Sequence, residues 1–250
     1  MSVEDLLRHP LLWRGQDGGA AGTAAIATGF AELDRYLPGG GWPLTGISEI
    51  FIERYGLGEL RLLMPALAAL SRHAVTARQW IVWIAPPFVP YAPALAEHGV
   101  DLSRILLVHP SGKKAAPKKV PGTKKKGVRH QKEKKVPGTF LADTREALWA
   151  IEQAIRSQSS AAVLAWVREA DVPALRRLQL AAEVCRCWTV LFRPLAAIGH
   201  SSPAALRLRL SAGVSGDAAA AMAGMPALGQ TGIHVEIQKC RGRRPRSFLL

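Results

Sequence analysis

The sequence predicts an α/β domain built around a mostly parallel central sheet that is flanked by helices. From Ile26 onward, short apolar runs rich in branched residues alternate with segments of helical period, and this alternation is typical of parallel strands joined by helices. Two later runs, 206–210 and 233–238, alternate apolar and polar residues instead, as half-exposed antiparallel strands do. We therefore expect a parallel core with antiparallel strands at its C-terminal end.

The individual elements are predicted from apolar period and from breakers. Strands are expected at 47–52, 79–84, 105–108, 161–167 and 189–192, and the one at 79–84 is expected to be buried. Helices are expected at 59–71, 143–157 and 174–187. The second of these helices begins with Asp143 and has Glu146 three residues later, the arrangement of a capping box. Prolines after Ile84 end the strand that precedes them.

Length and composition indicate one folded domain with additions. The chain has 250 residues, of which 48% are hydrophobic, and a mean hydropathy of +0.08, which excludes wholesale disorder. We assign 1–25 to a short helical patch and a Gly/Ala linker, 26–238 to the domain, and 239–250 to a basic tail. Three cysteines are too few for a disulfide framework. With no signal peptide and no apolar run of about 18 residues, we expect a protein of the cytoplasm.

The formal net charge of +14 is concentrated in two segments. Residues 113–135 contain eleven Lys and Arg against one Glu, and 239–246 contain five cations and no acid. The rest of the chain is close to neutral. Strong local positive charge is typical of contact with nucleic acid or another polyanion, so the location of the charge matters more than its total.

The Lys-rich segment has the character of an insertion into the domain, at about 111–139. The hexapeptide at 118–123 returns at 134–139, as in a low-complexity segment. Because this Pro- and Gly-containing stretch has few apolar residues, the apolar surface it could bury does not offset the conformational entropy lost on ordering. We expect a disordered loop that is either merely solvated or a tether to DNA without sequence preference. Its candidate DNA-binding residues are Lys113, Lys114, Lys118, Lys119, Lys124, Lys125 and Lys126.

The C-terminal segment supplies further candidates for phosphate contact. They are Lys239, Arg241, Arg243, Arg244 and Arg246, and guanidinium groups on a flexible arm suit phosphates. A frayed basic tail without a partner is the alternative.

Two segments near the N-terminus carry a resemblance to a known family. The run from Thr28 to Asp34, the glycine turn 38–43 and the strand start 46–50 resemble the opening of RecA-type recombinase cores. The motifs 8–15 and 57–63 are similar to the bacterial ImuA family, which is RecA-like and related to SulA. The resemblance covers roughly 8–110 and 140–250. It implies a RecA-like core, in which the loops 168–173 and 193–203 match those that hold DNA, and it adds Arg193 as a candidate.

The residues needed for a phosphate-binding loop are absent at the matching positions. Laying Gly-x4-Gly-Lys-Thr on the chain places Glu53 at the first glycine, Gly58 at the second, Glu59 at the lysine and Leu60 at the hydroxyl. A carboxylate in place of the lysine repels polyphosphate. The matching positions for a general base and a magnesium-orienting carboxylate fall near Pro87 and near Trp166 or Val167. ATP hydrolysis is therefore not expected.

The other reactive residue types form no catalytic or metal-binding pattern. The histidines lack the spacing of a zinc site. Cys185 and Cys187 face different sides of a predicted helix and are interpreted as core or boundary residues. The tryptophans in element interiors are also interpreted as core residues; they are Trp80, Trp83, Trp149 and Trp166. No catalytic residue, cofactor or metal is predicted.

The resemblance implies a non-catalytic accessory or scaffold protein of the SOS-induced translesion synthesis complex. Its implied partners are an ImuB-like inactive Y-family polymerase homologue and an error-prone replicative-type DNA polymerase, with RecA as a further candidate. It also implies a position near the nucleoid and no membrane contact. Two alternatives stay open: a SulA-like cell division inhibitor, which would share the fold, and a true ATPase, which would bind nucleotide.

Overall fold

The computed structural model describes residues 24–72, 79–110, 144–213, 232–240 and 245–250. The five strands predicted for the parallel core all lie within these ranges. The predicted N-terminal patch, the Lys-rich insertion and most of the Gly/Ala-rich connection after residue 212 lie outside them.

The core is an eight-stranded sheet with the order β10-β9-β8-β3-β7-β6-β4-β5. Its strands are β3 (Ile47–Ile52), β4 (Trp80–Ile84), β5 (Ile105–Val108), β6 (Ser160–Trp166), β7 (Trp188–Pro194), β8 (Leu206–Gly213), β9 (Gly232–Cys240) and β10 (Arg246–Leu249). All pairings from β8 to β5 are parallel, whereas β8 with β9 and β9 with β10 are antiparallel. The predicted α/β fold, mostly parallel with antiparallel C-terminal strands, is confirmed.

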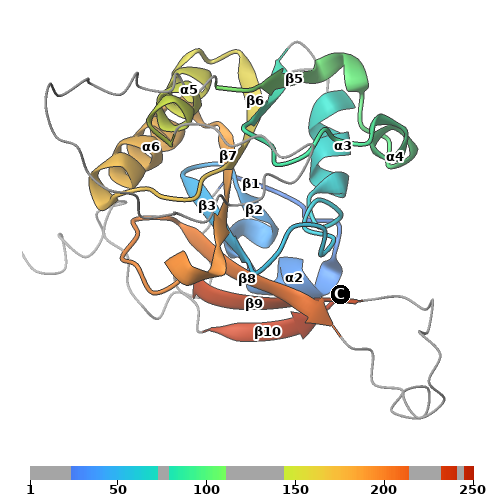
Figure 1. The fold of residues 1–250 in the computed structure, drawn as a ribbon. Helices are drawn as coiled ribbons and strands as arrows, with labels where there is room; N and C mark the ends of the chain where they lie inside the picture. The colour runs from blue at the N-terminus through green and yellow to red at the C-terminus, as the bar shows by residue number, and fades with distance from the viewer. Residues whose placement is uncertain (1–23, 73–78, 111–143, 214–231, 241–244) are drawn as a thin grey trace, which may run out of the picture.

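Helices cover both faces of this sheet (Figure 1). They are α2 (Ala31–Tyr36), α3 (Met64–Arg72), α4 (Ala92–Glu97), α5 (Thr144–Arg156) and α6 (Val172–Cys185). Short 3-10 turns are η1 (Pro38–Gly40), η2 (Leu102–Arg104) and η3 (Leu195–Ala197), and a two-stranded sheet joins β1 (Ala25–Ile26) to β2 (Trp42–Pro43).

The two faces of the sheet bury separate hydrophobic clusters. On one face α5 and α6 pack residues such as Ile151 and Leu178 against β4, β6 and β7. On the other, α2, α3 and α4 pack Leu33, Leu67 and Leu95 against all the long strands. The central strands β3 and β6 are buried along their whole length, as strands of a parallel sheet covered on both faces are. The alternation in β8 and β9 matches their one half-exposed face.

Local chemistry explains where two helices begin. Asp171 caps α6, because its carboxylate accepts a hydrogen bond from the Ala174 N–H at 2.8 Å. The helix predicted from Glu59 becomes regular only at Met64. Pro65 sits in the first turn of α3, where its missing N–H costs nothing, and would disrupt a helix that had started earlier. Residues 59–63 therefore form turns instead.

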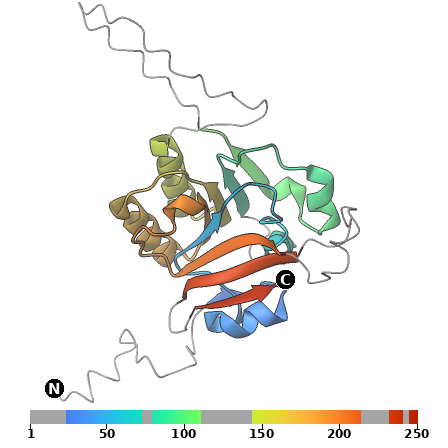
Figure 2. The same ribbon diagram turned by 60° about the horizontal axis from the view of Figure 1, so that its bottom comes forward.

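The last residues form a strand, although the sequence predicts a basic tail there. β10 pairs with β9 antiparallel, with Phe248 opposite Val235. Phe248 is buried and contacts the ring of Tyr36 in α2, with ring centroids 4.7 Å apart. Figure 2 shows α2 lying beside this edge of the sheet. The apolar Phe248 in an otherwise basic segment is the signal for this strand.

None of the helices in the described ranges is long and apolar enough to cross a membrane.

Candidate functional site

The loop that follows β3 contains the positions onto which the phosphate-loop motif is laid. It holds two glycines in the left-handed region, Gly56 at φ +85° and Gly58 at φ +91°, a conformation that glycine adopts without strain. A Cβ on Gly58 would lie 2.9 Å from Ile233 Cδ1 of β9, so this glycine also permits close packing. Glu53 at the first position of the loop is exposed.

The carboxylate of Glu59 turns back into this loop. The Gly56 N–H donates to both of its oxygens, each at 3.1 Å, and Glu59 is buried. Backbone N–H groups in such loops are the usual donors to a bound anion. Here the Glu59 carboxylate accepts the hydrogen bond of one such donor, the Gly56 N–H.

An aromatic pair borders the same loop. Tyr55 meets the ring of Phe88 edge-on, with centroids 6.2 Å apart, and both side chains are partly exposed. Burial raises the pKa of Tyr55, the Arg168 guanidinium opposes the rise and Glu59 adds to it. The positive charge of Arg168, in the loop after β6, thus acts on Tyr55 in the loop after β3.

The positions matched to a general base and to a magnesium-orienting carboxylate lie after β4 and at the end of β6. Pro87 follows β4, after Ala85 at φ +54°. Trp166 ends β6 and Val167 follows it, and both are buried. In the part of the chain that the structure describes, no three His, Cys, Asp or Glu side chains are grouped so as to hold a metal ion.

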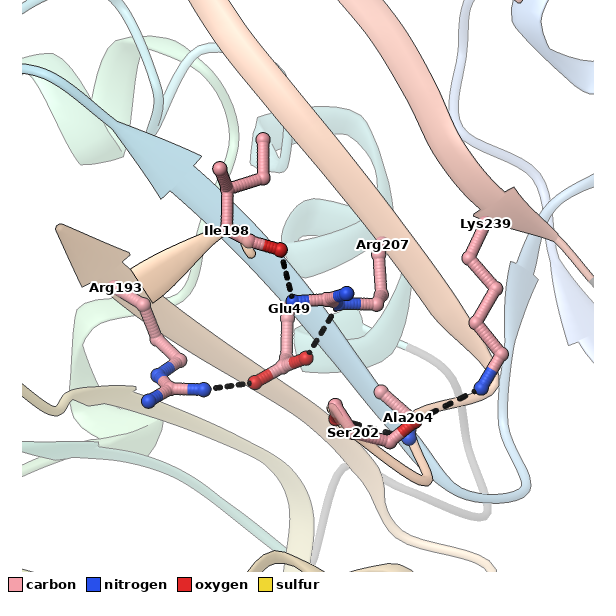
Figure 3. A network of polar contacts seen from close by, with 7 residues as sticks. All are labelled: Glu49, Arg193, Ile198, Ser202, Ala204, Arg207 and Lys239. Atoms are coloured by element: carbon pink, nitrogen blue, oxygen red, sulfur yellow. Dashed lines mark hydrogen bonds and ion pairs between the residues drawn. The ribbon is translucent and has the colours of Figure 1, made fainter. Parts of the chain in front are cut away.

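A buried ionic cluster joins the three central strands β3, β7 and β8 (Figure 3). Glu49 of β3 is 0% exposed; its Oε1 lies 2.6 Å from Arg193 Nη1 and its Oε2 lies 3.0 Å from Arg207 Nε. Arg207 Nη2 also donates to the Ile198 carbonyl at 2.9 Å, which holds the segment after η3 onto the sheet. Its guanidinium carbon is 4.7 Å from the ring centroid of buried Phe51.

Sequence reasoning missed this cluster. Arg193 was expected on an exposed loop facing phosphates, but it lies within β7 and is 1% exposed. The correction has a physical reason, since a guanidinium at that depth needs an anion and Glu49 supplies it. The available signal was a single charge in each of two apolar strands, Glu49 in the first and Arg193 in the second.

A pocket of about 890 Å³ lies at the carboxyl ends of β6 and β7. Its lining comes from the start of α5, the loop after β6, the start of α6, and the segment from Arg193 to His200. Trp149 of α5 lines the pocket and is 66% exposed. The interpretation of Trp149 and Trp80 as core residues is therefore wrong, whereas Trp83 and Trp166 are buried as predicted.

Of the remaining candidates for phosphate contact, only Lys239 and Arg246 lie among the residues that the structure describes. The seven lysines of the insertion, and Arg241, Arg243 and Arg244, lie outside the described residues. Lys239 is exposed at the end of β9, and its Nζ donates to the Ser202 carbonyl at 3.0 Å. Arg246 lies over the Tyr36 ring, 4.6 Å from its centroid, and contacts the Tyr36 hydroxyl. Lys239 and Arg246 are thus fixed on the antiparallel end of the sheet.

The cysteines lie in the core and at its boundary, as predicted. Cys185 is half-buried at the end of α6, and Cys187 is buried just before β7. Burial raises the pKa of Cys187 to about 12, whereas an unfolded cysteine titrates near 8.5.

We expect Cys187 to resist alkylation at pH 8 in the folded protein, because the reactive thiolate is almost absent there. In denaturant it should react at the rate of an ordinary thiol. Tryptic cleavage after Arg186 separates Cys185 from Cys187, so mass spectrometry after a timed iodoacetamide pulse can measure each. Equal labelling of Cys187 with and without denaturant would contradict the assignment.

The fold and these sites define a class of protein. The chain is an α/β protein with a mostly parallel sheet, in which the Glu59 carboxylate contacts the loop after β3 and an ion cluster joins β3, β7 and β8.

Comparison with known proteins finds a distant homologue and a structural neighbour. The chain is a distant homologue of Protein ImuA from two strains of Caulobacter vibrioides, 26% identical over 245 residues that span 91% of this chain and 83% of that protein. No protein-family model matches the chain. Among solved structures, SulA from Pseudomonas aeruginosa aligns with 59% of this chain and 97% of its own, at 22% identity and a TM-score of 0.38. That TM-score supports no functional conclusion.

Proposed function

We propose that the protein is a non-catalytic scaffold of the SOS-induced translesion synthesis complex, acting in the cytoplasm near the nucleoid. The observation that carries the non-catalytic part is the Glu59 carboxylate, which accepts the Gly56 N–H inside the loop where an ATPase would hold phosphate. A negative charge at this place repels a polyphosphate. The distant homology to ImuA supports the assembly role.

The proposed partners are inferred from that homology. They are an ImuB-like inactive Y-family polymerase homologue and an error-prone replicative-type DNA polymerase, with RecA as a further candidate. DNA would be bound without sequence preference through the Lys-rich segment and the basic C-terminal residues.

Co-purification tests the scaffold role. The full chain, co-expressed with the ImuB-like protein of the same genome, should elute with it from a gel-filtration column at moderate salt, and adding the polymerase should give a ternary complex. Nuclease treatment before the column excludes bridging by DNA. Separate elution of all three proteins would refute the proposal.

A SulA-like division inhibitor is the second candidate, because the sequence resemblance extends to that relative of the RecA-like proteins. Such a protein would act on the tubulin-like division protein. Overexpression would then produce filamentous cells, even in a strain that lacks the ImuB-like protein. Normal division in that strain would exclude this candidate.

We expect no binding of ATP and magnesium at millimolar concentrations by isothermal titration calorimetry. The reason is electrostatic, since Glu59 is buried and directed into the loop. A Gly58→Ala variant whose fold has been checked by circular dichroism serves as the comparison. Micromolar affinity in the wild type that this variant abolishes would contradict this interpretation of the loop.

Removing residues 113–135 should weaken DNA binding and flatten its salt dependence. Each lost phosphate contact lowers the slope of log K against log[salt] by about 0.7–0.9, and the segment carries eleven cations. Fluorescence anisotropy with a labelled single strand at several salt concentrations measures the slope. A control that replaces the same residues with a Gly/Ser sequence of equal length separates charge from length. An unchanged slope would exclude the DNA role of this segment.

A further inference from the structure

We propose that the pocket at the carboxyl ends of β6 and β7 binds an acidic segment of a partner polypeptide. One carboxylate of that segment would face Arg168 and Arg193, and a neighbouring apolar side chain would pack on Trp149. The inference rests on the proposed scaffold function and names a docking surface for it.

The floor of the pocket holds an excess of positive charge. Arg193 lines the pocket and is 1% exposed. Its Nη1 is used by Glu49, but its Nε has no hydrogen-bond acceptor among the residues that the structure describes. Glu49 also pairs with Arg207, so one buried carboxylate serves two guanidinium groups. An incoming carboxylate would supply the missing negative charge and an acceptor.

The acidic residues of the lining are mostly engaged already. Glu152 lies 3.0 Å from Arg156 and 3.7 Å from Arg177. Asp171 caps α6 by accepting the Ala174 N–H. Arg168 and His200 are exposed on the rim. The third acid of the lining, Glu169, is exposed beside Arg168, so a carboxylate that enters from solvent faces two cationic or titratable side chains and one acid at the rim.

The charge balance favours a single carboxylate over a nucleic acid. The lining contains four arginines, at 145, 168, 177 and 193, and three acids, at 152, 169 and 171. A nucleic acid would bring a row of phosphates against three carboxylates, and an excess of one cation is too small to offset them. One carboxylate matches the excess of one positive charge.

The apolar surroundings favour a polypeptide over a small metabolite. Trp149 is 66% exposed on α5, and α6 exposes Val172, Leu180 and Val184 by 45%, 55% and 79%. Of these four, only Trp149 lines the pocket, and the others lie elsewhere on α6, one of the two helices that contribute to the lining. Large apolar side chains left in water on such helices are typical of a surface that a protein partner covers. The pocket volume is sufficient for a few side chains of that partner.

Selection from a random 12-residue phage library tests the inference without assuming a partner. The full chain is the target, and clones that also bind a W149A/R168E variant are removed. We expect the enriched peptides to carry Asp or Glu beside an apolar residue. A synthetic peptide of that set should lose at least tenfold in affinity when its acid is changed to the amide. It should lose as much on the W149A and on the R168E protein.

Matched variants control for folding and net charge. R176E changes the same charge on an exposed arginine of α6 outside the lining, and W80A removes a partly exposed tryptophan of β4. Both should bind the peptide as the wild type does. Enriched peptides without acids, or binding that the lining variants do not weaken, would overturn the inference. Competition by free glutamate with the same affinity as the peptide would also overturn it. The same holds if no peptide is enriched and a 20-nucleotide oligo-dT binds the wild type but binds the lining variants more weakly.

The same variants separate this inference from the scaffold proposal. If W149A and R168E still co-purify with the ImuB-like protein as the wild type does, the docking surface is wrong while the scaffold role stands. If acidic peptides bind the pocket but the ImuB-like protein never co-purifies, the scaffold role fails while the pocket stands.

Discussion

Replacing Glu49 by alanine should destabilise the protein by about 3–5 kcal/mol, because it leaves two guanidinium groups in the sheet without their anion. Arg193 and Arg207 both depend on this carboxylate, at 2.6 and 3.0 Å. The loss is a large share of the roughly 5–15 kcal/mol that stabilises an ordinary domain. Urea unfolding followed by tryptophan fluorescence measures it.

A surface ion pair supplies the comparison for Glu49. Glu236 lies 3.6 Å from Arg209, and both side chains are more than a third exposed. Glu236→Gln should therefore cost about 0–1 kcal/mol, because water screens such a pair. If Glu49→Ala and Glu236→Gln shift the urea midpoint equally, the buried cluster does not stabilise the fold as described.

Replacing Trp42 by alanine should cost about 3–5 kcal/mol through the cavity it leaves. Trp42 of β2 is 0% exposed, and its ring centroid lies 5.8 Å from that of Trp188 in β7. This contact fixes the small β1–β2 sheet onto the core. Thermal unfolding by circular dichroism measures the loss.

Two further variants test the cause at Trp42. Trp42→Phe keeps most of the ring, and it removes an indole N–H that has no acceptor among the described residues, so it should cost far less than alanine. Trp80→Ala, at a side chain 40% exposed, should be milder than Trp42→Ala. Equal losses for the three variants would contradict cavity formation as the cause.

The sequence was sufficient to predict the order and type of the core elements. The predicted strands at 47–52 and 105–108 coincide with β3 and β5. Apolar residues dominate both, although β3 includes Ser48 and Glu49, and β5 is an edge strand with Leu106 and Leu107 exposed. In β8 and β9 the alternation of apolar and polar residues predicted the half-exposed face, because successive side chains of a strand point to opposite faces of the sheet. Local patterns carry this information without any knowledge of tertiary contacts.

Features that depend on distant contacts could not be predicted in this way. The glycines at 38–43 indicate a flexible connection, yet this turn brings Trp42 into the core. Arg193 was expected on a loop because its partner Glu49 lies 144 residues earlier. Trp149 was expected in the core because the period of its helix does not show which residues face the pocket.

The mismatch between the chain and the phosphate-loop motif can be seen residue by residue in the sequence, but the direction of the Glu59 side chain cannot. The spacing placed a carboxylate where a lysine is needed. Only the structure shows that this carboxylate folds back onto the Gly56 N–H. Side-chain direction in a loop depends on the backbone dihedrals of its glycines.

The Glu49 cluster also bears on how the chain folds as it leaves the ribosome. Its two arginines come 144 and 158 residues later in the chain, so most of the polypeptide must be synthesised before the carboxylate can be neutralised. Until then, β3 carries a charge that is costly to bury, although it is the strand between β7 and β8. The domain therefore completes its core only after Arg207 has emerged, and a nascent chain arrested before that residue would expose the centre of its sheet to chaperones and proteases.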